Sequence, residues 1–212
     1  MDRMSPSIVL ASASPRRADL LRMLGIPFTV QPSNVSEEVD RQQGPADHVL
    51  EIAKRKASAV ASNYKKELVL GADTVVALGD AILEKPTDSR DAADMLGRLS
   101  GNTHQVYTGL VLIDTATGII LSDVAATDVT MRIISPEEIN SYVHTKEPMD
   151  KAGAYAAQGR AAVFVESVSG CFYNVVGLPL MVFWELMTRV LGAPPVSLFS
   201  GGSGDLVSPQ ES

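Results

Sequence analysis

The chain has 212 residues, 45% of them hydrophobic, so it is long enough and apolar enough to bury a full core as one large domain or two small lobes. Its formal net charge of −7 and its isoelectric point near 4.9 argue against a surface that follows a long nucleic acid. No stretch approaches the roughly 20 apolar residues of a membrane span, and the start, MDRMSPS, lacks the layout of a signal peptide, so we expect a cytoplasmic protein.

The first half of the chain alternates predicted strands and helices, which favours an α/β sheet with parallel pairs. Apolar runs predict the strands, and Pro, Gly and capping residues mark the helix ends. In chain order the prediction gives a strand over 7–11, a helix over 15–24, a strand over 28–33, a helix over 45–63, a strand over 67–78, a turn at 79–81 into 82–86, and a helix over 90–101 capped by Asp88 or Ser89.

The second half predicts long strands that hairpin turns can join. Residues 104–134 predict two or three strands with a turn at 114–118, and Ser135 with Glu138 forms the capping box of a helix over 135–145. More strand over 161–179 and a closing helix over 178–192 complete one folded domain over 1–192. The remaining 193–212 are rich in Pro, Gly and Ser, and we expect a disordered, dispensable tail.

Two arginines occupy the first turn of the first predicted helix. Ser14 is placed as its N-cap and Pro15 as its first residue, so Arg16 and Arg17 fall at the positive end of the helix dipole, where each cation costs a few tenths of a kcal/mol. An anion would offset that cost, because free backbone N–H groups and guanidinium forks both bind phosphate. The alternative, that both arginines are solvated or paired with nearby acids, is equally open on this pattern alone.

Asp73 is the most informative single residue, because it lies in the apolar run VLGADTVV. An ionised carboxylate that is buried there needs a cation. Gly71 permits close approach of backbone or ligand, Thr74 adds a hydroxyl at the same strand end, and ligands bind beyond the carboxyl ends of strands in α/β sheets. A structural Asp at a turn is the commoner explanation for one Asp-Thr pair.

Charged residues of both signs lie at several predicted turns and helix starts. Phosphoryl chemistry uses such a set, because basic side chains bind a triphosphate and acidic side chains hold a divalent ion or orient a water. The single Cys171 and three scattered histidines leave no zinc framework, so any metal should be a hard ion, Mg²⁺ or Mn²⁺. Each lysine by itself is more often a solvated side chain. The group comprises Glu37, Asp73, Arg16, Arg17, Lys56 and Lys85.

A loop over 146–159, KEPMDKAGAYAAQG, has a composition suited to binding a ring. It contains Gly153, Tyr155, Gln158 and Gly159, and the amide of a glutamine can pair with a donor–acceptor edge of a base. A turn with a satisfied glutamine is the simpler interpretation of this loop on its own.

Together these segments resemble the Maf (septum formation inhibitor Maf-like) family of nucleoside triphosphate pyrophosphatases over about residues 7–191. The resemblance implies a mixed α/β fold with a twisted sheet in two lobes around a central cleft, similar to the inosine triphosphate pyrophosphatases, and a homodimer. The matching segments, in order, are SASPRR, the Glu37 loop, Lys56, GADTVV, LEKP, SGNTHQVYTG, EPMDKAGAYAAQG and NVVGLPL.

The resemblance also implies a reaction, the hydrolysis of a nucleoside triphosphate to the monophosphate and pyrophosphate. Asp73 matches the general base, and Glu37 matches an acid for the metal or the water, so both are candidate ligands of Mg²⁺ or Mn²⁺. Asp73 can alternatively serve as a metal ligand only. Lys56 and Lys85 match the lysines on the phosphate side. The residues expected to hold phosphates are Ser12, Ser14, Arg16 and Arg17.

The segment DKAGAYxxQG is similar to the family branch that acts on dTTP and UTP, whose specificity positions match Arg16, Thr74 and Gln158. The branch for 7-methyl-GTP usually has a cysteine after the aspartate and lacks the glutamine. Ala156 and Ala157 replace a commoner Gly-Ile pair, a departure that can shift the loop. A 7-methyl-GTP pyrophosphatase and a nucleotide-binding regulator of cell division remain the alternatives.

Overall fold

The computed structural model describes residues 7–38 and 43–196, so the expected disorder of the tail lies outside the described residues from 197 onward. The fold is mixed α/β, as predicted. Its strands are β1 (Ile8–Leu10), β2 (Phe28–Val30), β3 (Leu68–Leu78), β4 (Ala81–Leu83), β5 (Thr103–Asp114), β6 (Ile120–Met131) and β7 (Val165–Ser169). Its helices are α1 (Pro15–Met23), α2 (Pro45–Ala61), α3 (Ser89–Leu99), α4 (Pro136–His144), α5 (Phe172–Val176) and α6 (Leu180–Leu191), with 3₁₀ turns η1 (Glu147–Asp150), η2 (Ala152–Ala154) and η3 (Arg160–Phe164).

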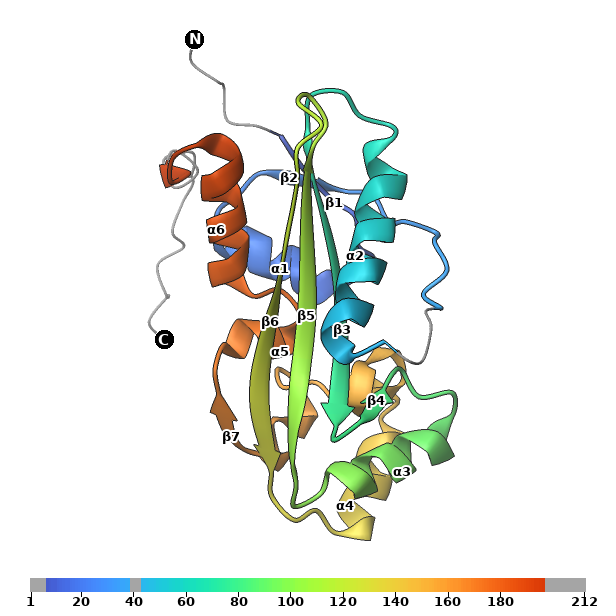
Figure 1. Ribbon diagram of the computed structural model, residues 1–212. Coiled ribbons are helices and arrows are strands. Elements are labelled where there is room, and N and C mark those ends of the chain that lie inside the picture. Colours follow the sequence, from blue (N-terminus) through green and yellow to red (C-terminus); the bar gives the residue numbers. More distant parts are fainter. Residues whose placement is uncertain (1–6, 39–42, 197–212) are drawn as a thin grey trace, which may run out of the picture.

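The described strands form one sheet in the order β2-β1-β3-β5-β6-β7, with β4 paired to β3 (Figure 1). The predicted parallel pairs are confirmed for β1, which lies parallel to both β2 and β3. From β3 to β7 the pairing is antiparallel. The predicted turn at 114–118 joins β5 to β6, and a tight turn can join only antiparallel strands.

The lengths of β1 and β3 leave part of one strand edge open. β1 pairs only with Leu68–Leu70, and β4 returns to the same strand only at Val76–Leu78. Between them, no strand within residues 7–38 and 43–196 pairs with this edge of β3 from Gly71 to Val75. The prediction that Asp73 and Thr74 stand at a strand end was therefore wrong for β3 itself: they lie within it, just beyond the carboxyl end of β1.

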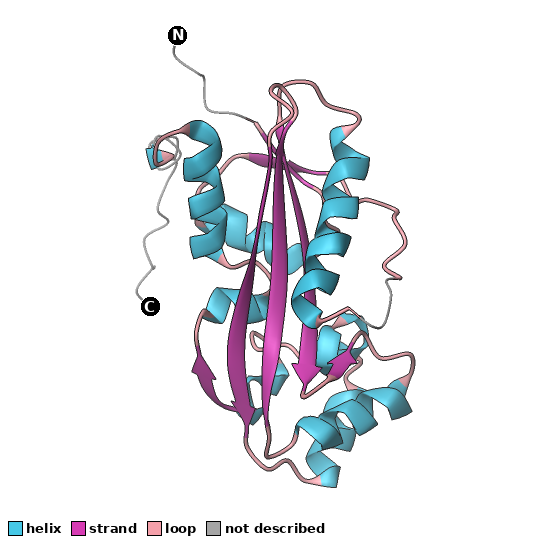
Figure 2. Cartoon of the chain, viewed as in Figure 1, coloured by secondary structure: helices cyan, strands magenta, loops and turns pink. Residues whose placement is uncertain are grey.

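Helices cover both faces of the sheet (Figure 2). α2 packs on one face so closely that a Cβ on Gly71 would lie 2.3 Å from the Ala53 carbonyl oxygen and one on Gly109 would lie 2.7 Å from the Val49 carbonyl oxygen. α1 and α6 cover the other face at one end of the long strands, with Leu21 and Phe183 in their shared core.

A second core at the other end of the long strands makes the molecule two-lobed, as expected. There α3, α4 and the 3₁₀ turns pack against the far halves of β3, β5 and β6 (Figure 1). Its largest buried members include Leu96, Leu99, Met131, Tyr142 and Phe164. The predicted capping box is confirmed at the start of α4, where Ser135 and Glu138 exchange hydrogen bonds.

The prediction of strand throughout 161–179 was wrong outside Val165–Ser169. The preceding stretch is the 3₁₀ turn η3, and Phe172–Val176 forms the short helix α5. Gly170 (φ 125°) and Gly177 (φ 113°) adopt conformations that interrupt extended structure on both sides of α5. The buried Asn174 side chain donates hydrogen bonds to the Val106 carbonyl oxygen and to Thr127, which fixes the helix against β5 and β6.

Candidate active site

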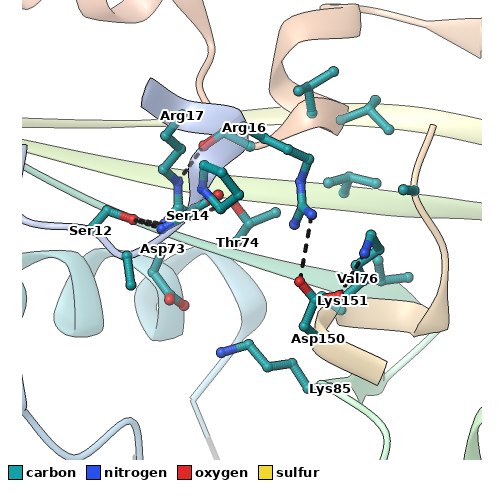
Figure 3. A pocket seen from close by; sticks show the side chains of 18 of the residues that line it. Ser12, Ser14, Arg16, Arg17, Asp73, Thr74, Val76, Lys85, Asp150 and Lys151 are labelled. Carbon is teal, nitrogen blue, oxygen red and sulfur yellow. Dashed lines mark hydrogen bonds and ion pairs between the residues drawn. The ribbon is translucent and has the colours of Figure 1, made fainter. Parts of the chain in front are cut away.

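A cleft of about 310 Å³ lies along the open edge of β3 (Figure 3). Its walls come from both lobes: the segment 11–17 at the start of α1, the end of α5 and Gly177 belong to one, and the loop 150–158 belongs to the other. Every candidate site residue predicted from the sequence lines this cleft. They are Ser12, Ser14, Arg16, Arg17, Glu37, Lys56, Asp73, Thr74, Lys85 and Gln158.

Lys56 joins the two candidate carboxylates. Its Nζ lies 2.7 Å from Glu37 Oε1 and 2.7 Å from Asp73 Oδ1, and Asp73 is only 9% exposed. The buried carboxylate thus has the cation that its apolar surroundings require. Lys85 Nζ lies 3.4 Å from the other oxygen of Glu37. Burial by itself raises the pKa of Glu37, but the hydrogen bonds and charges of Lys56 and Lys85 together lower it, so this pKa lies below its usual value.

The same pair of carboxylates fits a divalent ion as part of its ligand set. The described residues contain no group of three or more His, Cys, Asp or Glu side chains placed to hold a metal. Mg²⁺, however, is commonly bound by one or two carboxylates, with waters and substrate phosphates as its remaining ligands. Asp73 makes its contact with Lys56 through Oδ1, and no described residue donates a hydrogen bond to Oδ2. The site therefore offers two carboxylates but no closed cage.

The two arginines of α1 differ in what they contact. Arg17 is 8% exposed, and its guanidinium donates to the Gly177 carbonyl oxygen (2.8 Å), to Ser12 Oγ (2.9 Å) and to Thr74 Oγ1 (2.9 Å). Burial lowers the pKa of Arg17, and the charge of Asp73 opposes that shift. Arg16 faces the open cleft, with Nη1 4.0 Å from Asp150 Oδ2. Arg17 thus fastens three parts of the cleft wall together, while Arg16 is available to a ligand.

The start of α1 supplies hydrogen-bond donors to the same wall. Ser14 occupies the N-cap position as predicted, but its side chain makes no cap hydrogen bond. Ser12 Oγ instead accepts from the Ser14 backbone N–H at 3.2 Å and from Arg17. The N–H groups of the first helical turn have no partner within the helix, so they can meet an anion in the cleft.

The cleft has a charged half and an apolar half because successive side chains of a strand point to opposite faces. Asp73 points towards α2 and Lys56, whereas Thr74 and Val76 point to the other face (Figure 3). On that face the cleft is lined by Val106, Val175 and Tyr155. Its apolar lining suits a planar ring better than a phosphate.

The loop 150–158 closes the apolar half. Gly153 (φ 66°) lies so close to β3 that a Cβ there would come within 2.8 Å of Val76 Cγ2, which explains why glycine is needed. The Gln158 side chain lines the cleft, is exposed, and has no hydrogen bond to any described residue, so it is available to a ligand.

Sequence reasoning named Tyr155 in this loop but missed Asp150 and Lys151 in the wall and His104 behind it. Lys151 donates to the Glu147 carbonyl oxygen (2.7 Å) and to Asp150 (2.6 Å), so it holds the start of the loop. Burial by itself raises the pKa of Asp150. The hydrogen bond and charge of Lys151, with the charge of Arg16, lower it, and the net shift is downward. Tyr155 is anchored by the buried His104, whose Nε2 lies 2.8 Å from its hydroxyl. The clustering of these residue types in DKAGAY was the available signal, but no pattern linked His104 to them.

The fold and the cleft define the class of protein. It is a two-lobed α/β protein, and its cleft has a charged half with cations, a helix N-terminus and two carboxylates, beside an apolar half. The family model described as "Maf-like protein" matches residues 7–190. The chain belongs to the Maf-like protein family.

Curated relatives cover most of this chain. It is 47% identical over 173 residues to a protein of Desulforamulus reducens named dTTP/UTP pyrophosphatase, a match that covers 82% of this chain and 91% of that protein. It is 49% identical over 180 residues to a protein of the same name from Moorella thermoacetica, covering 85% and 93%. The solved structure of the Staphylococcus aureus Ham1 protein aligns with 88% of this chain and 98% of its own at 14% identity and a TM-score of 0.46.

Among the described residues no helix is both long enough and apolar enough to cross a membrane.

Proposed function

We propose that this protein is a nucleoside triphosphate pyrophosphatase that hydrolyses dTTP and UTP to the monophosphate and pyrophosphate. The relatives named dTTP/UTP pyrophosphatase support the substrate class. The observation that carries the chemistry is the position of Asp73, whose carboxylate lies at the cleft with one oxygen on Lys56 and the other without a described donor.

In this proposal Asp73 is the general base. Its unengaged oxygen accepts a proton from a water, the water oxygen forms a bond to the α-phosphorus, and the bond from that phosphorus to the bridging oxygen breaks. Pyrophosphate leaves with the electron pair of that bond. The Asp73 carboxylate suits this role because it lines the cleft, where its unengaged oxygen can accept a hydrogen bond from a water.

The cations of the charged half bind the triphosphate. Arg16 and Lys85 face the cleft with partly exposed side chains, and the N-terminal N–H groups of α1 lie on the same wall. Lys56 keeps Glu37 and Asp73 together and neutralises part of their charge. Arg17 and Ser12 hold the wall in place and present their remaining donors to the phosphates.

Glu37 would hold a divalent ion, Mg²⁺ or Mn²⁺, with phosphate oxygens and waters completing its shell, and Asp73 would be a further ligand only if it left deprotonation of the water to that ion. When bound, that ion supplies charge neutralisation of the phosphates and acidifies a coordinated water. The apolar half receives the base, with Gln158 and Thr74 as its polar contacts.

The test is pyrophosphate release by the purified protein with Mg²⁺ or Mn²⁺, using dTTP, UTP, CTP, GTP, 7-methyl-GTP and inosine triphosphate as substrates. We expect turnover of dTTP and UTP, and loss of that turnover in Asp73→Asn with nucleotide binding retained. Preference for 7-methyl-GTP would contradict the substrate assignment, and no turnover of any triphosphate would favour the regulator.

Two expectations from the sequence belong to the same proposal: a cytoplasmic location and a homodimer. Light scattering of the purified chain tests whether it is a dimer. A fully active monomer would show that dimerisation is not needed for activity.

A further inference from the structure

A fully buried threonine lies directly behind the cleft wall. Thr108 is 0% exposed and stands opposite Thr74 in the β3–β5 ladder. Its Oγ1 lies 2.9 Å from Thr74 Oγ1 and 3.2 Å from the backbone carbonyl oxygen of Asn174 in α5. Because Thr108 does not line the cleft, it acts on a ligand only through Thr74.

Thr108 can make both contacts as hydrogen bonds in only one arrangement. A carbonyl oxygen can only accept, so in that arrangement the single hydroxyl proton of Thr108 goes to Asn174. Thr108 must then accept in its contact with Thr74, and the single hydroxyl proton of Thr74 points at Thr108.

Arg17 fixes the other side of Thr74. A guanidinium only donates, and Arg17 Nη2 lies 2.9 Å from Thr74 Oγ1, so one lone pair of this oxygen is used. Thr74 is partly exposed and lines the cleft. It therefore offers a ligand one remaining lone pair and no proton, which means that it can accept a hydrogen bond but cannot donate one.

The position of Thr74 connects this polarity to the base. Thr74 lies on the same face of β3 as Val76, beside the apolar half, where a ring fits. Uracil and thymine carry an N–H at ring position 3, whereas cytosine has an unprotonated nitrogen there. An oxygen that can only accept forms a hydrogen bond with the N–H of uracil or thymine. Against cytosine, a lone pair of that oxygen faces the lone pair of the ring nitrogen, and no hydrogen bond forms.

We propose that Thr108 is a positioning residue that makes Thr74 an obligate acceptor, and that Thr74 thereby selects uracil and thymine over cytosine through the ring N–H. The inference rests on the proposed function, since it specifies how the same cleft chooses its base.

The first test compares kcat/KM for UTP and CTP in the wild type and in Thr108→Val, which keeps the shape of the side chain and removes its hydroxyl. Thr74 is then free to turn its proton to the ligand, so we expect the UTP:CTP ratio to fall by about tenfold. Thr108→Ser keeps the hydroxyl and should keep the ratio.

Thr127→Val is the matched control, because it also removes a buried hydroxyl that bonds Asn174 but does not contact Thr74. Its ratio should equal that of the wild type, whatever its stability. An equal loss for UTP and CTP in Thr108→Val, with the ratio unchanged, would mean that Thr108 only supports the fold and would overturn the inference.

The second test uses the wild type alone and so does not depend on the folding of a variant. Deprotonation of the ring N–H removes the donor, and in 5-fluoro-UTP this N–H is more acidic than in UTP. We expect kcat/KM for 5-fluoro-UTP to decline at lower pH than for UTP, while CTP shows neither decline. Coincident profiles for the two uracil nucleotides would overturn the acceptor assignment.

The outcomes separate the inference from the function on which it rests. If the wild type hydrolyses neither UTP nor dTTP, the proposed function fails and the inference with it. If it hydrolyses CTP as well as UTP, or if the ratio is unchanged in Thr108→Val, the inference alone fails.

Discussion

Asp73 and Thr74 are neighbours in β3, yet their side chains reach the same cleft from opposite faces of the sheet, one against Lys56 and the other against Arg17. This is possible only because the edge of β3 is open between β1 and β4, so the cleft wraps around the strand. The charged and apolar halves of the site meet at this pair of residues.

Removal of the Lys56 ammonium should destabilise the protein strongly. Lys56→Met leaves the buried Asp73 carboxylate without its cation, and we expect a loss of about 3 kcal/mol in the free energy of unfolding at pH 7. The deficit should shrink in acid as that carboxylate binds a proton. Urea denaturation at pH 7 and pH 4 measures it, with the exposed neighbour Lys54→Met as the control. Equal deficits at both pH values would contradict this account.

Glu37 should contribute stability only when it is ionised. Its pKa is lowered in the folded state, so its contribution is present above the ordinary glutamate pKa and is lost as the pH falls through the folded value. Because the side chain is half exposed, we expect less than about 1 kcal/mol between wild type and Glu37→Gln at pH 7. The difference should vanish once the pH lies below the lowered folded-state pKa of Glu37. Glu38→Gln, which changes an exposed neighbour, should show no such trend.

His104 should make the protein acid-sensitive over a defined range. Burial lowers its pKa to about 4, so it is neutral at pH 7, and the unfolded state binds its proton first. Stability from this group is therefore complete above about pH 6.5 and is lost as the pH falls towards 4, by about 3 kcal/mol. His104→Gln should not show this loss when unfolding is followed against pH. If the wild type and His104→Gln show the same dependence of stability on pH, the assignment to His104 is refuted. It is also refuted if His144→Gln removes the acid-induced loss to a similar extent.

The two arginines of α1 should separate stability from substrate affinity. Arg17→Lys removes the guanidinium group, which donates hydrogen bonds to Gly177, Ser12 and Thr74. We expect about 2 kcal/mol of destabilisation, seen as a fall of several degrees in Tm. Arg16→Lys should leave Tm within about 1 degree of the wild type and should raise KM for the triphosphate. Thermal unfolding and initial rates on both variants decide this. The reverse pattern would mean that the roles are exchanged.

Local patterns identified much of the secondary structure, and together with the family resemblance they selected ten residues that all line one cleft. The start of α1 follows from Ser14 and Pro15, the start of α4 follows from the capping box of Ser135 and Glu138, and the ends of these helices fall within about two residues of those predicted. The run 161–179 was misread because helix α5 depends on the glycines around it and on Asn174, whose bonds reach distant strands.

By itself, then, the sequence determined the periodicities, the helix starts and the set of motifs, since each of these depends on residues a few positions apart. The tertiary structure decided that Lys56 joins Glu37 to Asp73, that Arg17 is fastened while Arg16 is open, and that Thr108 stands behind Thr74. These relationships depend on contacts across long stretches of chain, such as that between Arg17 and Gly177, and on an open strand edge created by the unequal lengths of β1 and β3. Side-chain type specifies what a residue can do, and only packing specifies which partner it meets.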